Sequence, residues 1–257
     1  MTAAGIVGVD AGGTWVRACL ARDGHKRRAR VRSTGDLSAA VRALFARLRL
    51  ARADALVVGA RGVWDPAQRR RATRALAPFA RRVRVLSDME LAWWGALGPE
   101  DGVLVVSGTG SAAFARAGRR SARVGGLGPL LGDEGSAFWI GRQWLRARPE
   151  PFALRWARRP DAVPAIASLA RSVLSRAARD RRARAILAEA AGHLARQAAR
   201  AARAVRLPRA RVSWAGGMLA DARFRALFAA RLRDELPGAR LEPPRLSPED
   251  AAALLLG

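Results

Sequence analysis

Two adjacent carboxylates, Asp133 and Glu134, lie in the most glycine-rich segment of the chain, GGLGPLLGDEGSAFWIG at residues 125–141. Glycine lets the backbone approach a ligand closely or adopt a positive φ, which other residues rarely do. Carboxylates in such a loop are suited to holding a metal ion or a polyhydroxylated molecule. An ordinary surface loop would not need so many glycines, so the segment predicts a binding site.

Two further glycine turns each follow a run typical of a β-strand. They are GVDAGGTWVR at residues 8–17 and LVVSGTGSA at residues 104–112. Turns of this kind present backbone N–H groups to phosphate oxygens. A tight hairpin also favours glycine, and the strand–turn–strand context of the second turn fits both interpretations. The matching first turn favours the phosphate interpretation, and repeated phosphate turns indicate a nucleotide site.

Two more aspartates lie at the ends of predicted strands. Asp10 ends the first strand, where it could orient Mg²⁺ directly or through water, or cap the glycine turn. Asp88 follows the apolar run VRVLS and opens the helical run MELAWWGAL, at the carboxyl end of a strand, where α/β proteins bind ligands. An N-cap would also suit Asp88, and both roles can hold at once.

Strands and helices alternate along the chain, which is typical of an α/β protein. Strands are predicted at residues 5–12, 16–21, 28–34, 55–61, 83–88, 103–110, 111–117, 122–128 and 211–217. Helices are predicted at residues 36–50, 66–79, 89–97, about 134–146, 222–236 and 247–256, with two long helices within 161–205. Asp36 and Ser247 are the natural N-caps of their helices. Both halves begin with a strand, a glycine turn and a strand, which indicates a duplicated fold with a cleft between the halves.

The chain is strongly basic, with a formal net charge of +26 over 257 residues. Lys26 is the single lysine among 47 basic residues, and asparagine and tyrosine are absent. A GC-rich genome explains this bias without selection for charge. A dedicated nucleic-acid binder concentrates its charge on a patch with interleaved aromatic residues, whereas here arginine is scattered between alanines and leucines along helices. The sequence therefore disfavours a dedicated nucleic-acid partner and predicts only nonspecific attraction of polyanions.

Cysteine content and apolar runs exclude several classes of protein. The single cysteine, Cys19, excludes a disulfide framework and an iron–sulfur cluster held by this chain's own thiolates. The start of the chain lacks the apolar middle of a signal peptide, and no apolar run approaches the ~20 residues of a membrane helix. We therefore expect a cytoplasmic protein with no membrane partner.

Four glycine motifs in this order resemble a known superfamily. The order Asp10-Ala-Gly-Gly-Thr14, Ser107-Gly-Thr-Gly-Ser111, Gly132-Asp-Glu-Gly135 and Ala215-Gly-Gly-Met218 is similar to that of sugar kinases, Hsp70 and actin. Within that superfamily the chain resembles the N-acetylglucosamine kinase and BadF-type ATPase family over nearly its whole length. The resemblance implies two ribonuclease-H-like lobes, at residues 1–106 and 107–257, with a nucleotide cleft between them. Its last helix would pack back on the first lobe.

The resemblance also implies roles for individual residues. Gly12, Gly13 and Thr14 would contact the β- and γ-phosphates of ATP, and Asp10 would hold Mg²⁺. The second phosphate turn would be formed by Gly108, Thr109 and Gly110, and the adenosine would be contacted by Gly216 and Gly217. Asp88 would act as the base toward a sugar hydroxyl. The sugar itself would be bound by Asp36, Ser111, Gly126, Gly128 and Asp133.

Three departures from the resembling kinases bear on the acceptor. Leu127 replaces a tryptophan, Gly35-Asp36 replaces an asparagine, and the stretch between Trp144 and Pro160 is short. An aspartate at position 36 can accept hydrogen bonds but cannot donate the amide N–H. Nucleotide binding is therefore better supported by the residues than the identity of the acceptor.

Three functions follow from these observations. The first is an ATP- and Mg²⁺-dependent kinase that phosphorylates an amino sugar, N-acetylglucosamine or glucosamine. The second is a BadF-type ATPase that couples hydrolysis to a partner protein. The third is a nucleotide-binding regulatory protein without turnover. The resembling kinases are often dimers, so a homodimer is also expected.

Overall fold

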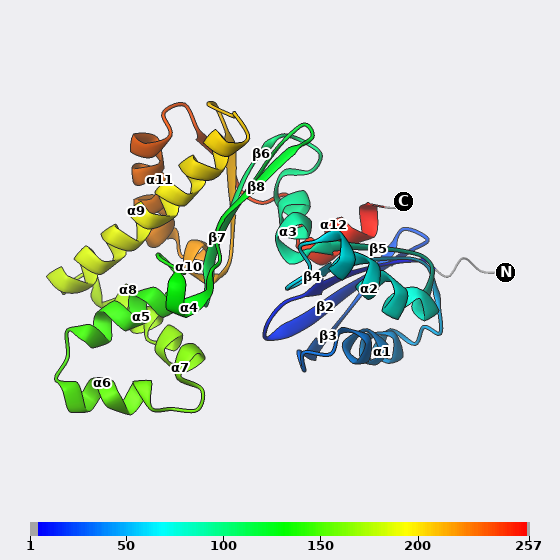
Figure 1. Cartoon of the computed structure of the whole chain (residues 1–257), viewed down its shortest axis with the longest axis horizontal. Helices are drawn as coiled ribbons and strands as arrows, with labels where there is room; N and C mark the ends of the chain where they lie inside the picture. The colour runs from blue at the N-terminus through cyan, green and yellow to red at the C-terminus, as the bar shows by residue number, and fades with distance from the viewer. Residues whose placement is uncertain (1–4, 256–257) are drawn as a thin grey trace. The chain divides into compact units, whose positions relative to one another are not determined.

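The computed structural model describes residues 5–255 and divides them into two compact units (Figure 1). Unit 1 contains residues 5–99 and 244–255, and unit 2 contains residues 100–243. The predicted boundary after residue 106 is therefore misplaced. Strand β6 (Gly102–Ser107) pairs with strands of unit 2 on both sides, so it belongs to that unit. The chain then returns to unit 1 for its last helix.

Unit 1 is built on a mixed sheet of five strands in the order β3-β2-β1-β4-β5. These strands are β1 (Ile6–Ala11), β2 (Trp15–Arg22), β3 (His25–Arg32), β4 (Ala53–Ala60) and β5 (Ala80–Ser87). The first three form an antiparallel meander, whereas β4 and β5 join β1 in parallel. Side chains alternate along β4, so Leu56 and Val58 lie in one apolar core and Val57 in another, on the opposite face.

Helices cover both faces of this sheet. They are α1 (Leu37–Leu48), α2 (Pro66–Leu76), the 3₁₀ turn η1 (Ala77–Phe79), α3 (Asp88–Leu97) and α12 (Pro248–Leu254). Helix α1 packs its apolar side on the Leu56 face, and α3 and α12 pack on the Val57 face. Asp36 caps α1 and Ser247 caps α12, as predicted. The last helix was predicted to reach residue 256, which lies outside the described residues.

Unit 2 repeats the arrangement of strands found in unit 1. Its sheet has the order β10-β9-β6-β7-β8, with an antiparallel meander β6-β7-β8 and parallel neighbours β9 and β10 on the other side of β6. The remaining strands are β7 (Ser111–Ala117), β8 (Arg120–Gly125), β9 (Arg211–Ala215) and β10 (Arg240–Leu241). The duplication inferred from the two strand–turn–strand runs therefore corresponds to two sheets of the same order.

The helices of unit 2 depart from the prediction. They are α4 (Gly128–Leu131), α5 (Ala137–Arg146), α6 (Glu150–Ala157), α7 (Ala162–Ser168), α8 (Ala170–Arg176), α9 (Arg181–Ala204), α10 (Gly217–Ala220) and α11 (Ala222–Glu235). Residues 161–205 form two short helices and one long one, because Asp180 caps α9 by accepting from the N–H groups of Arg182 and Ala183. Helix α5 begins after position 134, because the hydroxyl of Ser136 caps it.

Candidate functional site

Asp10 is the penultimate residue of β1 and is influenced by two other carboxylates of unit 1. The pKa of Asp10 is raised to about 6, mainly because the side chain is buried, and then because Glu249 and Asp88 are negatively charged. Arg17, with Nη1 3.6 Å from Asp10 Oδ2, opposes this rise. Sequence reasoning missed Glu249, because it lies in the capping turn of α12, far from every glycine motif. Its position over β1 follows from tertiary packing, since the backbone carbonyl of Glu249 lies against Gly8.

The first glycine turn offers two of its three predicted backbone donors. The N–H of Gly12 donates to Trp15 O at 3.1 Å, so it closes the turn between β1 and β2 and is taken. The N–H groups of Gly13 and Thr14 make no hydrogen bond within residues 5–255. Both residues are exposed, and these two groups are therefore available to an anion.

A pocket of about 410 Å³ in unit 1 is shared by this turn and Asp36. Gly12, Gly13, Arg61 and Asp36 are among the residues that line it. The Asp36 carboxylate accepts from Ala39 N at 3.0 Å as the N-cap of α1, and its second oxygen has no hydrogen-bond partner among the described residues. The predicted phosphate-binding glycines Gly12 and Gly13 and the predicted sugar-binding Asp36 therefore line the same cavity.

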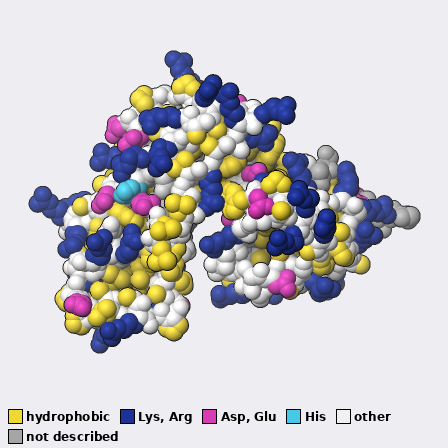
Figure 2. Space-filling model, viewed as in Figure 1, with side chains coloured by type: hydrophobic (Ala, Val, Ile, Leu, Met, Phe, Trp, Pro, Cys, Tyr) yellow, Lys and Arg dark blue, Asp and Glu magenta, His cyan; other side chains and the backbone are white. Residues whose placement is uncertain are grey.

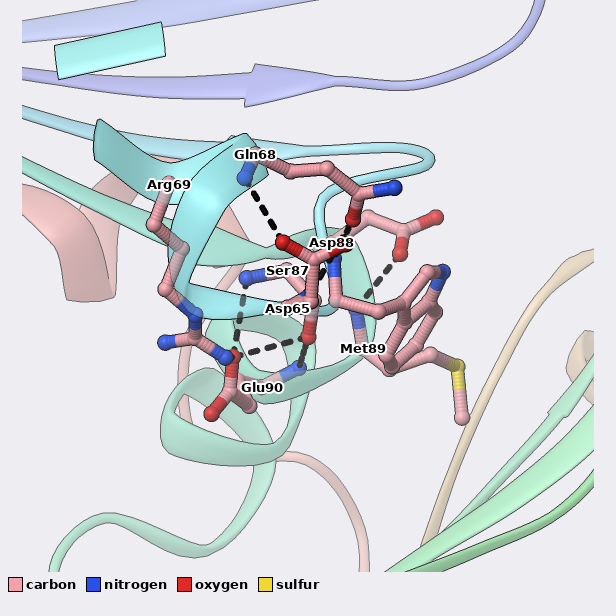
Figure 3. A network of polar contacts seen from close by, with 8 residues as sticks. Asp65, Gln68, Arg69, Ser87, Asp88, Met89 and Glu90 are labelled. Atoms are coloured by element: carbon pink, nitrogen blue, oxygen red, sulfur yellow. Dashed lines mark hydrogen bonds and ion pairs between the residues drawn. The ribbon is translucent and has the colours of Figure 1, made fainter. Parts of the chain in front are cut away.

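Asp88 occupies the first turn of α3, but it is not the N-cap (Figure 3). The cap is Ser87, whose hydroxyl accepts from Glu90 N at 3.1 Å while Glu90 Oε2 accepts from Ser87 N at 2.9 Å. Arg69 holds the same Glu90 oxygen at 2.7 Å. Because this capping box satisfies the start of the helix, the Asp88 carboxylate is not needed as a cap. It accepts from Met89 N at 2.9 Å.

The second glycine turn, in unit 2, is built like the first. The N–H of Gly108 donates to Gly110 O at 2.9 Å, and Gly108 O accepts from Ala137 N at the start of α5. The N–H groups of Thr109 and Gly110 make no hydrogen bond in the described part of the chain. In each unit, one backbone hydrogen bond therefore closes the glycine turn, and two N–H groups of the turn make no hydrogen bond among the described residues.

Two further predicted segments lie directly against this turn. A Cβ added at Gly216, where φ is +91°, would lie 2.4 Å from Ser107 O and 3.0 Å from Gly108 N. A Cβ added at Gly110 would lie 2.8 Å from Asp133 Oδ2. Side chains at either glycine would push these segments apart, so both glycines are required by close approach rather than by chance composition.

Asp133 is buried in this cluster, in the left-handed conformation with φ of 64°. Its Oδ1 accepts from Ser111 N at 3.2 Å, and the Ser111 hydroxyl donates to Glu134 O at 2.7 Å. The N–H of Gly126 donates to Ser111 O at 2.8 Å. The predicted acceptor residues Ser111, Gly126 and Asp133 therefore form one hydrogen-bonded group. Gly128 begins the short helix α4, and Gly217 begins α10 after the Gly216 turn.

Among the described residues no cluster of three or more histidine, cysteine, aspartate or glutamate side chains is arranged as a ready metal site. Cys19 is a buried free thiol, and burial raises its pKa to about 11, which fits the predicted core role.

The family model for the BadF/BadG/BcrA/BcrD ATPase family matches residues 7–252. The chain belongs to this family. An N-acetylmuramic acid/N-acetylglucosamine kinase of Clostridium acetobutylicum is 40% identical over 75 residues, which cover 29% of this chain and 24% of that kinase. The predicted membership is therefore confirmed over nearly the whole chain, whereas the match to a curated kinase spans only 24% of that protein's length.

Solved structures of other proteins share the fold. A candidate N-acetylglucosamine kinase from Chromobacterium violaceum is 25% identical with a TM-score of 0.74 and covers 98% of both chains. A second candidate N-acetylglucosamine kinase, from Porphyromonas gingivalis, is 19% identical with a TM-score of 0.78 and covers 97% of both chains. These likenesses confirm the predicted fold class, with two α/β lobes of the sugar-kinase and actin-like ATPase type.

Basic side chains of this BadF-family protein are spread over the visible face rather than gathered in one patch (Figure 2). This distribution agrees with the interpretation that composition, and not a dedicated site, produces the charge. None of the helices within residues 5–255 has both the length and the apolar character required to cross a bilayer.

Proposed function

We propose that the protein is an ATP-dependent kinase that phosphorylates an amino sugar, N-acetylglucosamine or glucosamine. Family membership supports the use of ATP. The observation that carries the proposal is the cluster in unit 2, where the Gly108–Gly110 turn lies against both Gly216 and Asp133. A phosphate turn in contact with a nucleoside turn on one side and a sugar-binding carboxylate on the other is what phosphoryl transfer to a sugar needs.

The nucleotide would be bound through backbone N–H groups of the glycine turns. Gly13 and Thr14 would donate their unused N–H groups to the β- and γ-phosphates, with Gly12 closing the turn that orients them. Thr109 and Gly110 would donate in the same way from the other turn, supported by Gly108, and Gly216 and Gly217 would leave room for adenosine. The buried carboxylate of Asp10, whose pKa the charges of Glu249 and Asp88 help to raise, suits Mg²⁺ directly or through water. Bound there, Mg²⁺ would neutralise the phosphate oxygens.

The acceptor would be oriented by carboxylates and activated by Asp88. Asp133 and Asp36 can accept hydrogen bonds from vicinal sugar hydroxyls, while Ser111, Gly126 and Gly128 shape the loop around the ring. Asp88, which is not the N-cap of α3, would take the proton from the attacking hydroxyl as that oxygen bonds to the γ-phosphorus. The bond from the γ-phosphorus to the bridging oxygen of ATP would break at the same time, and ADP would leave. Closure of the site would exclude water, so that the sugar and not water attacks.

The test is a panel assay that measures ADP release with neutral hexoses, amino sugars and no sugar. The kinase proposal predicts that release depends on an amino sugar. Release that is independent of sugar would instead support a BadF-type ATPase acting on a partner protein, and binding of ATP without release would support a regulatory protein. As part of the proposal the protein works in the cytoplasm, where ATP is available, and forms a homodimer, which sedimentation would test.

A further inference from the structure

Unit 2 contains a pocket of about 500 Å³ that is separate from the pocket described in unit 1. It lies on the side of the glycine-rich loop that faces α9. It is lined by the end of β8, by the α4 segment and by α9. None of the residues to which we assign a nucleotide or catalytic role lines it. Two leucines that line it, Leu127 and Leu131, are 66% and 78% exposed and add apolar surface to its edge.

Three arginines give this pocket an excess of positive charge. Arg123, Arg196 and Arg200 line it together with a single carboxylate, Glu134. Arg196 lies 3.8 Å from Glu235 and 3.3 Å from His193 Nδ1, and Arg123 donates to Gly126 O. Arg200 makes no hydrogen bond or ion pair with any residue between 5 and 255. A guanidinium without a partner beside two others is suited to a carboxylate or phosphate, which it can bind through two oxygens.

The same pocket is linked to the proposed acceptor loop through Gln197. This side chain is 7% exposed and lines the pocket, and its Nε2 donates to Glu134 O at 3.3 Å and to Ser111 Oγ at 3.5 Å. Its Oε1 is buried and has no partner among the described residues. Turning the amide over would place Oε1 against the Glu134 carbonyl, so the orientation is fixed by these contacts. Gln197 thus joins the helix that carries Arg196 and Arg200 to the residues around Asp133.

The exposed leucines limit the class of ligand. Inorganic phosphate alone would contact only the cations, whereas Leu127 and Leu131 add apolar surface of the kind that packs on the C–H face of a sugar ring. A pocket of this volume also has room for more than an oxyanion. We propose that it binds the carboxylate or phosphate group of a sugar-sized molecule, with Arg200 as its principal cation. The ligand is either an acceptor sugar with an acidic substituent or a sugar phosphate that acts as an effector.

Calorimetry at ~0.15 M salt, where general attraction to the basic surface is screened, tests this site. The probes are N-acetylmuramic acid, N-acetylglucosamine 6-phosphate, neutral N-acetylglucosamine and inorganic phosphate. Arg200→Ala is expected to weaken binding of at least one anionic sugar by about tenfold, the usual effect of removing a charge-assisted hydrogen bond. Binding of neutral N-acetylglucosamine should not change.

Arg182→Ala is the matched control, because Arg182 is also an exposed arginine of α9 but lies about 27 Å along the helix from Arg200. It should bind every probe as the unmodified protein does. Equal affinities of the two variants for both anionic sugars, or no binding of either anionic sugar, would overturn the proposal. If the affinity for N-acetylmuramic acid depends on Arg200, the ligand is an acidic acceptor. If the affinity for N-acetylglucosamine 6-phosphate depends on Arg200, the ligand is an effector.

The role of this pocket as an acceptor or effector site rests on the proposed kinase function, whereas its binding of anionic sugars does not. Calorimetry without ATP measures that binding separately from phosphorylation. If anionic sugars bind through Arg200 but no sugar is phosphorylated, the site stands and the kinase proposal fails. If a neutral amino sugar is phosphorylated but Arg200→Ala leaves anionic binding unchanged, the kinase proposal stands and the site is refuted.

Discussion

At the scale of single residues, Asp10 carries an electrostatic cost that a cation would remove. Burial and the charges of Glu249 and Asp88 raise its pKa to about 6 from a usual value of 3.8, so at neutral pH it is ionised against the preference of its surroundings. Groups held in this way are common where a ligand supplies the missing charge. The cost is therefore consistent with a site prepared for Mg²⁺ and a nucleotide.

Asp10→Asn is predicted to stabilise the protein at neutral pH when divalent cations are absent. An acid whose pKa is raised in the folded state is most favourable when protonated, so stability falls as pH rises from about 4 to about 6 and stays lower above that. Removing the charge should raise the free energy of unfolding at about pH 7 by about 1–3 kcal/mol and flatten this slope. Urea unfolding of the variant and of the unmodified protein at about pH 4 and about pH 7 measures this difference in the free energy of unfolding.

Asp23→Asn is the control for that experiment, since Asp23 is exposed and lies in a turn with φ of 48°, which asparagine tolerates. It should leave both the stability and its pH dependence unchanged. The account of Asp10 would be wrong if the two variants unfolded alike. The same Asp10→Asn variant should lose affinity for Mg²⁺-ATP.

Asp88→Asn is predicted to lower kcat by about 10²–10⁴-fold with little change in the KM for ATP, the usual range for loss of a general base. The fold should survive, because the Ser87–Glu90 capping box holds the start of α3 without Asp88. Steady-state kinetics with the best sugar of the panel measures the effect. Asp65→Asn, which changes another helix-start acid to an equally good cap, should retain activity. Undiminished turnover of Asp88→Asn would remove Asp88 from the mechanism.

At the scale of elements, α12 is joined to the sheet of unit 1 by Asp250. Both carboxylate oxygens accept from Arg28 Nη2 at 2.9 Å, and Ser247 donates to Oδ2 at 3.0 Å. Burial acts to raise the pKa of Asp250, but the hydrogen bonds from Arg28, Cys19 and Ser247 outweigh it and the pKa is lowered. The helix that carries Glu249 toward Asp10 is therefore held by this carboxylate in addition to its apolar packing.

Asp250→Ala is predicted to lower the free energy of unfolding by about 1–2 kcal/mol at neutral pH, since it removes several hydrogen bonds to a charged group, one of them from an exposed arginine. A lowered pKa means that this contribution is present above the usual pKa of 3.8 and is lost as pH falls below it. The variant and the unmodified protein should therefore converge in strong acid. Asp234→Ala, an exposed acid of α11, serves as the control. A constant difference at every pH would contradict this assignment.

Local patterns predicted the elements that carry the glycine turns, because a strand followed by glycines is decided by nearby residues. The caps Asp36 and Ser247 were predicted for the same reason. Residues 161–205 were misread, since alanine- and arginine-rich sequence is helical throughout and only the Asp180 cap and packing decide where it breaks. The approach of Glu249 to Asp10 and the Arg200 pocket depend on contacts distant in sequence, so no local pattern could reveal them.

At the scale of the whole molecule, the net charge of +26 has a consequence of its own. We predict that the protein binds DNA at low salt without regard to sequence and releases it by about 0.2 M salt, because scattered arginines exchange counterions but read no bases. Fluorescence anisotropy with two unrelated duplexes at increasing salt measures this. Retention of one duplex alone at the higher salt would contradict the expectation that the protein has no dedicated nucleic-acid site.

The central claim is that the protein transfers a phosphoryl group from ATP to an amino sugar and that Asp88 activates the sugar hydroxyl. Mass spectrometry of N-acetylglucosamine and glucosamine after incubation with the protein and Mg²⁺-ATP tests it most directly. The account predicts an amino sugar heavier by one phosphoryl group, formed by the unmodified protein and not by Asp88→Asn. Unaltered sugars in both reactions, or equal product from both proteins, would contradict it.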